Sequence, residues 1–272
     1  MKQTYLFSAP GRAEISGNHT DHQHGCVLAA AVDLETTAEV IVLNDPTIII
    51  YSEGYPSVQI NLNDLEVHPE ERNTTKALVR GVAAAFHQRG AKLKGFLAKV
   101  RSTVLPGSGL SSSAAFEVLI GTIINELFLE KKLTAVEIAQ IGQYAENVYF
   151  GKPCGLMDQT ASSVGGMVFI DFADPKAPVV EKLDFDFESA DHALCIIDCG
   201  ADHANLTVEY AAIPYELKAL CALFDKEVLR DIPKETFFKK LPEIRRQVSD
   251  RAILRAIHFY QENKRVQKQV EA

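Results

Sequence analysis

The sequence predicts an α+β protein, and three observations lead to this class. Short apolar segments with strand character crowd the first part of the chain, at residues 27–31, 39–43 and 47–51. Apolar residues recur at helical spacing through the middle. Helical patterns fill the last part, at residues 207–224 and 242–268. A start that is rich in strand patterns and an end that is filled with helical patterns favour the α+β class.

The composition is that of a globular protein. The chain has 272 residues, 47% of them hydrophobic, which is enough for one large core or two smaller ones. A formal net charge of −8 argues against a nucleic-acid partner, because phosphates select a basic surface. No signal peptide or membrane-length apolar run is present, and the scattered cysteines are expected to be reduced. We therefore expect a cytoplasmic protein with neither a nucleic-acid nor a membrane partner, and the sequence leaves its oligomeric state open.

The N-terminal part begins with a strand expected over residues 5–9, which ends at Pro10-Gly11. A polar segment over residues 11–25 follows, and little in it could fill a core. Three interpretations remain open, namely a solvated loop, a metal site of imidazole and carboxylate ligands, or recognition of a polyol by short polar groups. Its polar side chains are Arg12, Glu14, Asn18, His19, Asp21, His22 and His24.

The middle of the chain supplies three expected helices. The first is capped by Asn73 or Thr74 and extends to about residue 88. The second follows from the apolar spacing over residues 118–127. A capping box, T-A-V-E, opens the third over residues 134–149.

Strand patterns occur between and after these helices, at residues 96–101, 164–172 and 193–198. An acidic connector precedes the last of them, and the composition shifts there. We therefore expect two domains, over residues 1–190 and 191–272.

The most informative stretch is L-P-G-S-G-L-S-S-S-A-A at residues 105–115, which leads into an apolar helix-forming segment. Gly107 and Gly109 tolerate the backbone conformations of a tight turn around an anion. The serines at 111–113 stand where the helix would begin, so hydroxyls and unpaired first-turn N–H groups meet at the positive end of the helix dipole. We interpret the stretch as an anion site, and an ordinary loop with a helix cap is the alternative.

A single carboxylate, Asp158, follows the helix-breaking segment G-K-P-C-G at residues 151–155. A lone Asp after a turn is more often a helix cap than a catalyst. Its interpretation therefore depends on the rest of the chain.

Three separated motifs resemble, in order and spacing, those of the galactokinase branch of the GHMP small-molecule kinases. Residues 11–25 resemble the signature G-R-x-N-x-I-G-E-H-T-D-Y-x-x-G, residues 105–115 the phosphate-binding second motif, and residues 153–159 the segment with the catalytic Asp. P-loop kinases are the alternative class of phosphate-binding kinases, but their motif G-x-x-x-x-G-K-[ST] does not occur in the sequence. The resemblance implies a GHMP kinase fold, with an N-terminal ribosomal-protein-S5-domain-2-like domain and a ferredoxin-like C-terminal domain that is incomplete here.

The resemblance also implies an ATP-dependent kinase that phosphorylates the anomeric (C1) hydroxyl of galactose or a closely related sugar. Asp158 would accept or orient the proton of that hydroxyl, and Arg12 would stabilise the carboxylate and offset developing negative charge. Ser113, or Ser112, and Glu146 would hold Mg²⁺. Without the resemblance, a metal ligand and a solvated residue on a helix surface are equally good interpretations of Glu146.

The other implied site residues form two groups. The sugar would be contacted by Asn18, His19, Asp21, Gly155 and Tyr210. The phosphates of ATP would be held by Pro106, Gly107, Ser108, Gly109, Leu110, Ser111, Ser112, Ser113 and Ala114.

Three residues depart from the sugar signature. Glu14 stands where the signature has Asn, Asn18 stands where it has Glu, and His22 replaces the Tyr after T-D. Glu14 and Asn18 look like an exchange between two positions. If the usual Glu hydrogen-bonds the exocyclic hydroxyl of the sugar, Asn18 can still form that hydrogen bond, but without the strength of a charged acceptor. The preferred sugar therefore stays open.

Two further departures concern the nucleotide. The chain contains no Trp, whereas the family places one against the adenine near Thr74 or Thr75. No segment after Ala201 resembles the third, glycine-rich GHMP motif, and residues 251–268 resemble the helix that precedes it. We expect a shortened chain, so a non-catalytic sugar and nucleotide sensor, or an inactive shortened protein, is the alternative to a kinase.

Overall fold

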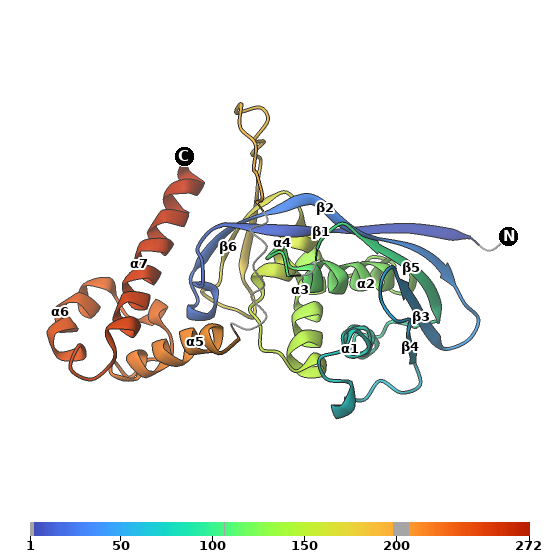
Figure 1. Ribbon diagram of the computed structural model, residues 1–272, viewed down its shortest axis with the longest axis horizontal. Coiled ribbons are helices and arrows are strands. Elements are labelled where there is room, and N and C mark those ends of the chain that lie inside the picture. Colours follow the sequence, from blue (N-terminus) through green and yellow to red (C-terminus); the bar gives the residue numbers. More distant parts are fainter. Residues whose placement is uncertain (1–2, 106, 198–206) are drawn as a thin grey trace. The chain divides into compact units, whose positions relative to one another are not determined.

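The computed structural model describes residues 3–105, 107–197 and 207–272 (Figure 1). The chain forms two compact units. Unit 1 consists of Met1–Ala13 and Ala31–Gly166, and unit 2 of Glu14–Ala30 and Met167–Ala272. Strands β1 (Thr4–Ser16) and β2 (Cys26–Val42) pair with each other and contribute residues to both units. The expected domain boundary after residue 190 stays a prediction.

The sheet of unit 1 combines β2 with β3 (Thr47–Ser52), β4 (Val58–Asn61) and β5 (Phe96–Ser102). The order is β4-β3-β5-β2, in which β3 runs parallel to β5 and the other pairs are antiparallel. The register places Ala98 opposite Val40 and beside Ile50, and all three are buried. Alternate residues of these strands therefore face one core, as the period-two apolar pattern predicts.

Helices α1 (Thr75–Gln88), α2 (Ser112–Phe128) and α3 (Ala135–Tyr144) lie on one face of this sheet (Figure 1). Phe86 of α1, Phe96 of β5 and Leu119 of α2 belong to one buried apolar cluster, which joins the helices to the strands. Helix α4 (Met157–Val164) follows a π-helical turn at Ala145–Phe150. Short 3₁₀ turns lie at Asp21–Gln23, Pro69–Glu71 and Leu229–Asp231.

The expected helices of this unit are confirmed, and their starts follow the local signals. Thr74 accepts a hydrogen bond from the N–H of Ala77 at the start of α1. At the start of α3, Thr134 and Glu137 form the complete capping box. These bonds satisfy amide groups that the first turn of a helix leaves without partners.

Unit 2 pairs the first residues of β2 with β6 (Met167–Asp171), and β6 with β7 (Val179–Leu183), all antiparallel. Its helices are α5 (Thr207–Ala222), α6 (Lys234–Ile244) and α7 (Asp250–Glu271). A separate apolar cluster holds the helices together through Leu220, Phe237 and Phe259.

Several expectations about strands and helices are wrong. The strand expected at 5–9 continues through Pro10-Gly11 as β1, and those expected at 27–31 and 39–43 are one long strand, β2. The stretch that joins them alternates polar and apolar residues, so it forms one solvated and one buried face rather than a turn. No strand forms at residues 193–197, and Asp198 lies outside the described residues. Helix α6 was not expected, because Pro242 lies within it.

Across the part of the chain that the structure describes, no helix is both long enough and apolar enough to cross a membrane. The cysteines described are free thiols, at Cys26, Cys154, Cys195 and Cys221.

Candidate active site

The glycine-serine loop enters α2 through left-handed backbone. Gly107 and Gly109 have φ values of 74° and 77°, and Ser111, the N-cap residue, has a φ of 55°. The side chain of Ser111 makes no capping hydrogen bond, so the first-turn amides of α2 receive none from it. The loop therefore has the turn geometry and the helix N-terminus that the sequence predicts for an anion site. Pro106 lies outside the described residues.

Asp158 sits in the first turn of α4, whose N-cap is Leu156, so the carboxylate is not the cap of its helix. Its Oδ1 accepts hydrogen bonds from Arg12 Nε at 2.9 Å and from Arg12 Nη2 at 2.7 Å. Its Oδ2 accepts a short hydrogen bond from Ser111 Oγ. The Asp158 side chain is 35% exposed and that of Arg12 is 12% exposed, so the carboxylate remains accessible to a ligand.

Arg12 connects this carboxylate to the glycine-serine loop. Its Nη1 donates to the carbonyl oxygen of Gly109 at 2.5 Å, and its backbone N–H donates to the carbonyl of Leu110 at 3.1 Å. Neighbouring Gly11 allows this approach, because a Cβ there would lie 3.0 Å from the Leu110 oxygen. The structure thus brings Arg12, Asp158 and Ser111 together at the N-terminus of α2, within unit 1.

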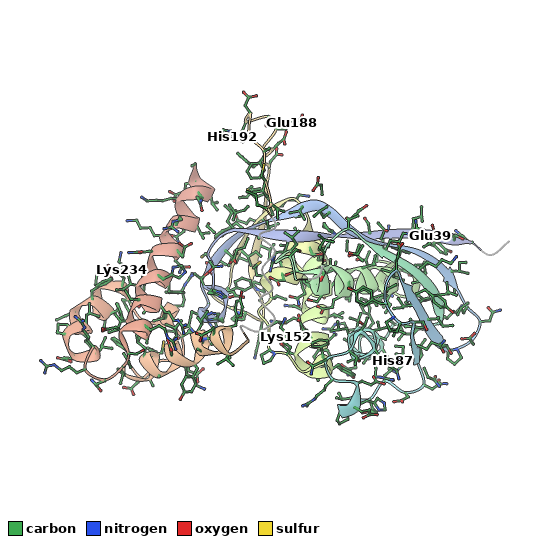
Figure 2. All side chains as sticks on the ribbon, viewed as in Figure 1. Glu39, His87, Lys152, Glu188, His192 and Lys234 are labelled. Atoms are coloured by element: carbon green, nitrogen blue, oxygen red, sulfur yellow. The ribbon has the colours of Figure 1, made fainter. Side chains whose placement is uncertain are left out.

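Glu146 lies in the π-helical turn and is only 4% exposed, which rules out the solvated-surface alternative. Its Oε2 accepts a hydrogen bond from Gln159 Nε2 at 3.0 Å, and its Oε1 lies 3.4 Å from the Nζ of Lys152, a residue labelled in Figure 2. The same Gln159 amide also donates to Glu117 Oε2 at 3.0 Å. The buried side-chain amide of Gln159 therefore donates to two carboxyl groups, and Gln159 directly follows Asp158 in the chain.

Glu117 is almost fully buried in α2. Burial raises the pKa of its carboxyl group well above the usual range, and the negative charge of Glu146 adds to this effect. Among the described residues, the buried Oε1 atoms of Glu117 and Gln159 have no hydrogen-bond partner. Both are oxygen acceptors beside Glu146, so the donor chemistry here is the hard oxygen type that Mg²⁺ prefers.

The candidate sugar residues Asn18, His19 and Asp21 lie in the β1–β2 loop (Gly17–Gly25) of unit 2. The ring of Tyr210 on α5 lies 5.6 Å from that of His19, centroid to centroid. Burial lowers the pKa values of both His19 and His22 below the ordinary histidine value. No three metal-ligating side chains converge in the described ranges, which leaves the metal-site interpretation of this loop without support.

Asn18 is hydrogen-bonded to Glu14, which also differs from the galactokinase signature. Its Nδ2 donates a hydrogen bond to Glu14 Oε2 at 2.9 Å. An amide and a carboxylate therefore still stand side by side at these two positions. The remaining sugar candidate, Gly155, is exposed and belongs to unit 1.

Sequence reasoning missed Glu117 and Gln159. Glu117 carried a usable signal, because it is the one charged residue in the otherwise apolar segment A-A-F-E-V-L-I-G that opens α2. A charge on the buried side of a helix is retained only with partners or as the neutral acid. Gln159 gave no such signal, since a Gln in the first turn of a helix is ordinary.

Comparison with known proteins supports this assembly of motifs. A family model of the GHMP kinases N terminal domain matches residues 77–166, and a galactokinase galactose-binding signature matches residues 1–41. The crystal structure of Lactococcus lactis galactokinase complexed with galactose aligns with a TM-score of 0.80 at 24% identity, over 98% of this chain and 69% of that one. Methanococcus jannaschii mevalonate kinase aligns with a TM-score of 0.59 at 17% identity, over 99% and 80%. The fold is therefore that of the GHMP kinases, as the sequence predicts.

Two relatives narrow the assignment. A galactokinase of Streptomyces coelicolor is 30% identical over 268 residues, which cover 97% of this chain and 68% of that protein. A galactokinase of Actinobacillus pleuropneumoniae is 32% identical over 267 residues, which cover 97% and 67%. The chain spans about two thirds of the length of these relatives. Within the GHMP kinases, it belongs to the galactokinase family.

Proposed function

We propose that the chain is an ATP-dependent kinase that transfers the γ-phosphoryl group to the anomeric hydroxyl of galactose or a closely related sugar. The observation that carries the proposal is the arrangement of Arg12, Asp158 and Ser111 at the N-terminus of α2. In this arrangement an accessible carboxylate lies next to a helix N-terminus, whose backbone N–H groups favour an anion, and this supports the proposal. Membership of the galactokinase family and the match to the galactose-binding signature support the choice of sugar.

In the proposed reaction, the sugar O1–H approaches the carboxylate of Asp158. A bond forms between O1 and the γ-phosphorus while the bond from that phosphorus to the β,γ-bridging oxygen breaks, and the proton of O1 passes to the carboxylate. The products are the sugar 1-phosphate and ADP. The guanidinium of Arg12 holds the carboxylate in place through two hydrogen bonds and offsets negative charge near the phosphates.

The loop from Gly107 to Ala114 would hold the ATP phosphates, through its backbone amides and the hydroxyls of Ser111, Ser112 and Ser113. Glu146 and Ser113, or Ser112, would hold Mg²⁺, and the unpartnered oxygen atoms of Glu117 and Gln159 beside Glu146 fit that assignment. When bound, the ion would neutralise negative charge on the phosphates during transfer.

The sugar would be bound by Asn18, His19, Asp21, Gly155 and Tyr210. Hydroxyl groups both donate and accept hydrogen bonds, so a set of amide, imidazole, carboxylate and phenol groups suits them. The Glu14 carboxylate stands next to Asn18 and supplies the charged acceptor that the usual signature has at position 18.

The test is ADP release, measured in a coupled assay over a panel of hexoses with ATP and Mg²⁺. We expect turnover with galactose or a close relative, and Asp158→Asn to lower kcat by roughly 10²–10⁴-fold with a much smaller effect on the sugar KM. Asp33→Asn, on an exposed position of β2, is the matched control and should retain wild-type kinetics. The absence of turnover with every hexose would reject the proposal, and an unchanged kcat in Asp158→Asn would reject Asp158 as the base.

A further inference from the structure

The β1–β2 loop, Gly17–Gly25, has an irregular backbone. Gly17, His19 and His24 all have positive φ values, of 94°, 58° and 58°. Left-handed backbone is unfavourable for residues other than glycine and persists only where the surroundings hold it. Local support comes from backbone hydrogen bonds within the loop, such as those from the N–H groups of Gln23 and Gly25 to the carbonyl oxygen of Thr20, and from Thr20 Oγ1, which lies within hydrogen-bond distance of the carbonyl oxygens of Gly17 and Cys26. The rest of the support comes from elsewhere in unit 2.

Helix α7 provides part of that support through one face, and the turn Leu229–Asp231 provides another part through hydrogen bonds to Gln23 and His24. Glu262 Oε2 accepts a hydrogen bond from the N–H of Gly17 at 3.1 Å, and the bond is buried. Asn263 Oδ1 accepts one from the N–H of Cys26 at 2.7 Å. Both ends of the loop backbone are thus fixed by consecutive residues of the same helix.

His258 lies four residues before Glu262 and therefore on the same face of α7. Its Nε2 lies 2.9 Å from the carbonyl oxygen of Asn18, which can only accept, so the ring nitrogen donates. This bond reaches the backbone of a candidate sugar residue directly. Seven residues beyond Glu262, Gln269 Oε1 accepts a hydrogen bond from Ser16 Oγ, which extends the same row of contacts to the end of β1.

The loop is closely packed at two of its glycines, against α7 at Gly25 and against the start of β2 at Gly17. A Cβ at Gly25 would lie 2.8 Å from Asn263 Oδ1 and 2.9 Å from Phe259 Cε2, and one at Gly17 would lie 2.4 Å from the Cys26 oxygen. Glu262 is only 4% exposed and is also ion-paired with Arg265. A buried carboxylate fixed in this way is a strong acceptor for a backbone N–H.

We propose that α7 is a positioning element of the sugar site. In this proposal His258, Glu262 and Asn263 hold the loop backbone so that Asn18, His19 and Asp21 meet the sugar hydroxyls in a fixed geometry. The inference rests on the proposed function for the identity of the ligand. These helix residues bond to backbone groups of the loop, so they act through the loop and not on the reacting atoms. Their loss should therefore weaken sugar binding more than it slows phosphoryl transfer or weakens ATP binding.

The experiment compares two alanine variants with two variants that keep an acceptor oxygen. Glu262→Ala and Asn263→Ala should each raise the sugar KM roughly tenfold, because a backbone N–H in the interior loses its partner. Glu262→Gln and Asn263→Asp should stay within about threefold of wild type, since each still presents an oxygen to the amide. Gln267→Ala, at an exposed position of α7, is the control and should change nothing. The ATP KM should stay constant in all five proteins.

Hydrogen exchange at the Gly17 and Cys26 amides gives a second readout that does not depend on turnover. Faster exchange in the alanine variants, together with the rise in sugar KM, supports the inference. Unchanged sugar KM and unchanged exchange would overturn it. An equal rise of the KM for sugar and the KM for ATP, with a large fall in Tm, would also overturn the inference, because it would mean that α7 only stabilises the fold. If wild type turns over no hexose, the proposed function fails, while exchange at these two amides still decides whether α7 holds the loop.

Discussion

Glu14 and Asn18 are hydrogen-bonded neighbours that occupy each other's usual places in the galactokinase signature, and exchanging them is a direct test of the sugar site. Asn18→Glu alone would place a second carboxylate where the amide now lies 2.9 Å from Glu14 Oε2. Glu14→Asn alone would leave two amides, which can still share a hydrogen bond. The double variant restores an amide and a carboxylate, in the reverse order.

The size of the effect follows from this distance. Asn18→Glu loses a hydrogen bond to a charged group, worth about 1.5–3 kcal/mol. Two unit charges at about 3 Å repel by about 1.4 kcal/mol in a water-like environment, which suits this exposed pair. The single variant should therefore lose about 3 kcal/mol, or roughly 100-fold in kcat/KM for the sugar. Glu14→Asn should lose roughly tenfold, and the double variant should recover to within about tenfold of wild type.

The assay is steady-state ADP release with varied sugar, on wild type, both single variants and the double variant. Treated as a double-mutant cycle, the four values of kcat/KM give the coupling between the two side chains. Raising the ionic strength should partly restore Asn18→Glu, because salt screens exposed like charges. Additive losses in the double variant would refute the reasoning, since they would mean that the two positions act independently.

Two pH-dependent effects on stability should be visible in urea unfolding. Hydrogen bonds from buried Arg80 lower the pKa of Glu71 to about 2, so the carboxylate stabilises the fold above its ordinary pKa of 4.5, and this is lost as pH falls toward about 2. Glu71→Gln should lower the free energy of unfolding by about 3 kcal/mol at pH 7 and show no such acid loss. Glu117 has the opposite effect on stability, because burial raises the pKa of its carboxyl group. Above the ordinary pKa of 4.5, the free energy of unfolding should fall by about 1.4 kcal/mol per pH unit until the pH passes the raised pKa. Glu117→Gln should remove that slope, and identical slopes in wild type and this variant would contradict the assignment.

The sequence predicted best those features that depend on neighbours in the chain. The starts of α1 and α3 followed from Thr74 and Thr134, whose caps are made with residues three positions later. The turn glycines 107 and 109 adopt the positive φ values expected of them. Each of these interactions is complete within one helical turn or loop, so no other part of the molecule is needed to predict it.

The features that the sequence did not predict depend on contacts between residues far apart in the chain. Pro10-Gly11 reads as a turn, yet it continues β1, which pairs with the distant strand β2. The glycine meets a different need, because a Cβ there would lie 3.0 Å from the Leu110 oxygen. Arg12 and Asp158 are 146 residues apart, and only the family resemblance, not any local pattern, put them in one site. The pairing of Gln159 with Glu117 and Glu146 escaped prediction for the same reason, since it joins three separate turns of helix.

The hydrogen bonds between α7 and the β1–β2 loop have a consequence for how the protein is made. Gly17 and Glu262 are 245 residues apart, and Cys26 and Asn263 are 237 apart. At ordinary translation speeds, α7 leaves the ribosome roughly 10–50 s after the loop that it holds. We therefore expect the β1–β2 loop to reach its native form only after α7 has been synthesised, even though the loop itself leaves the ribosome much earlier.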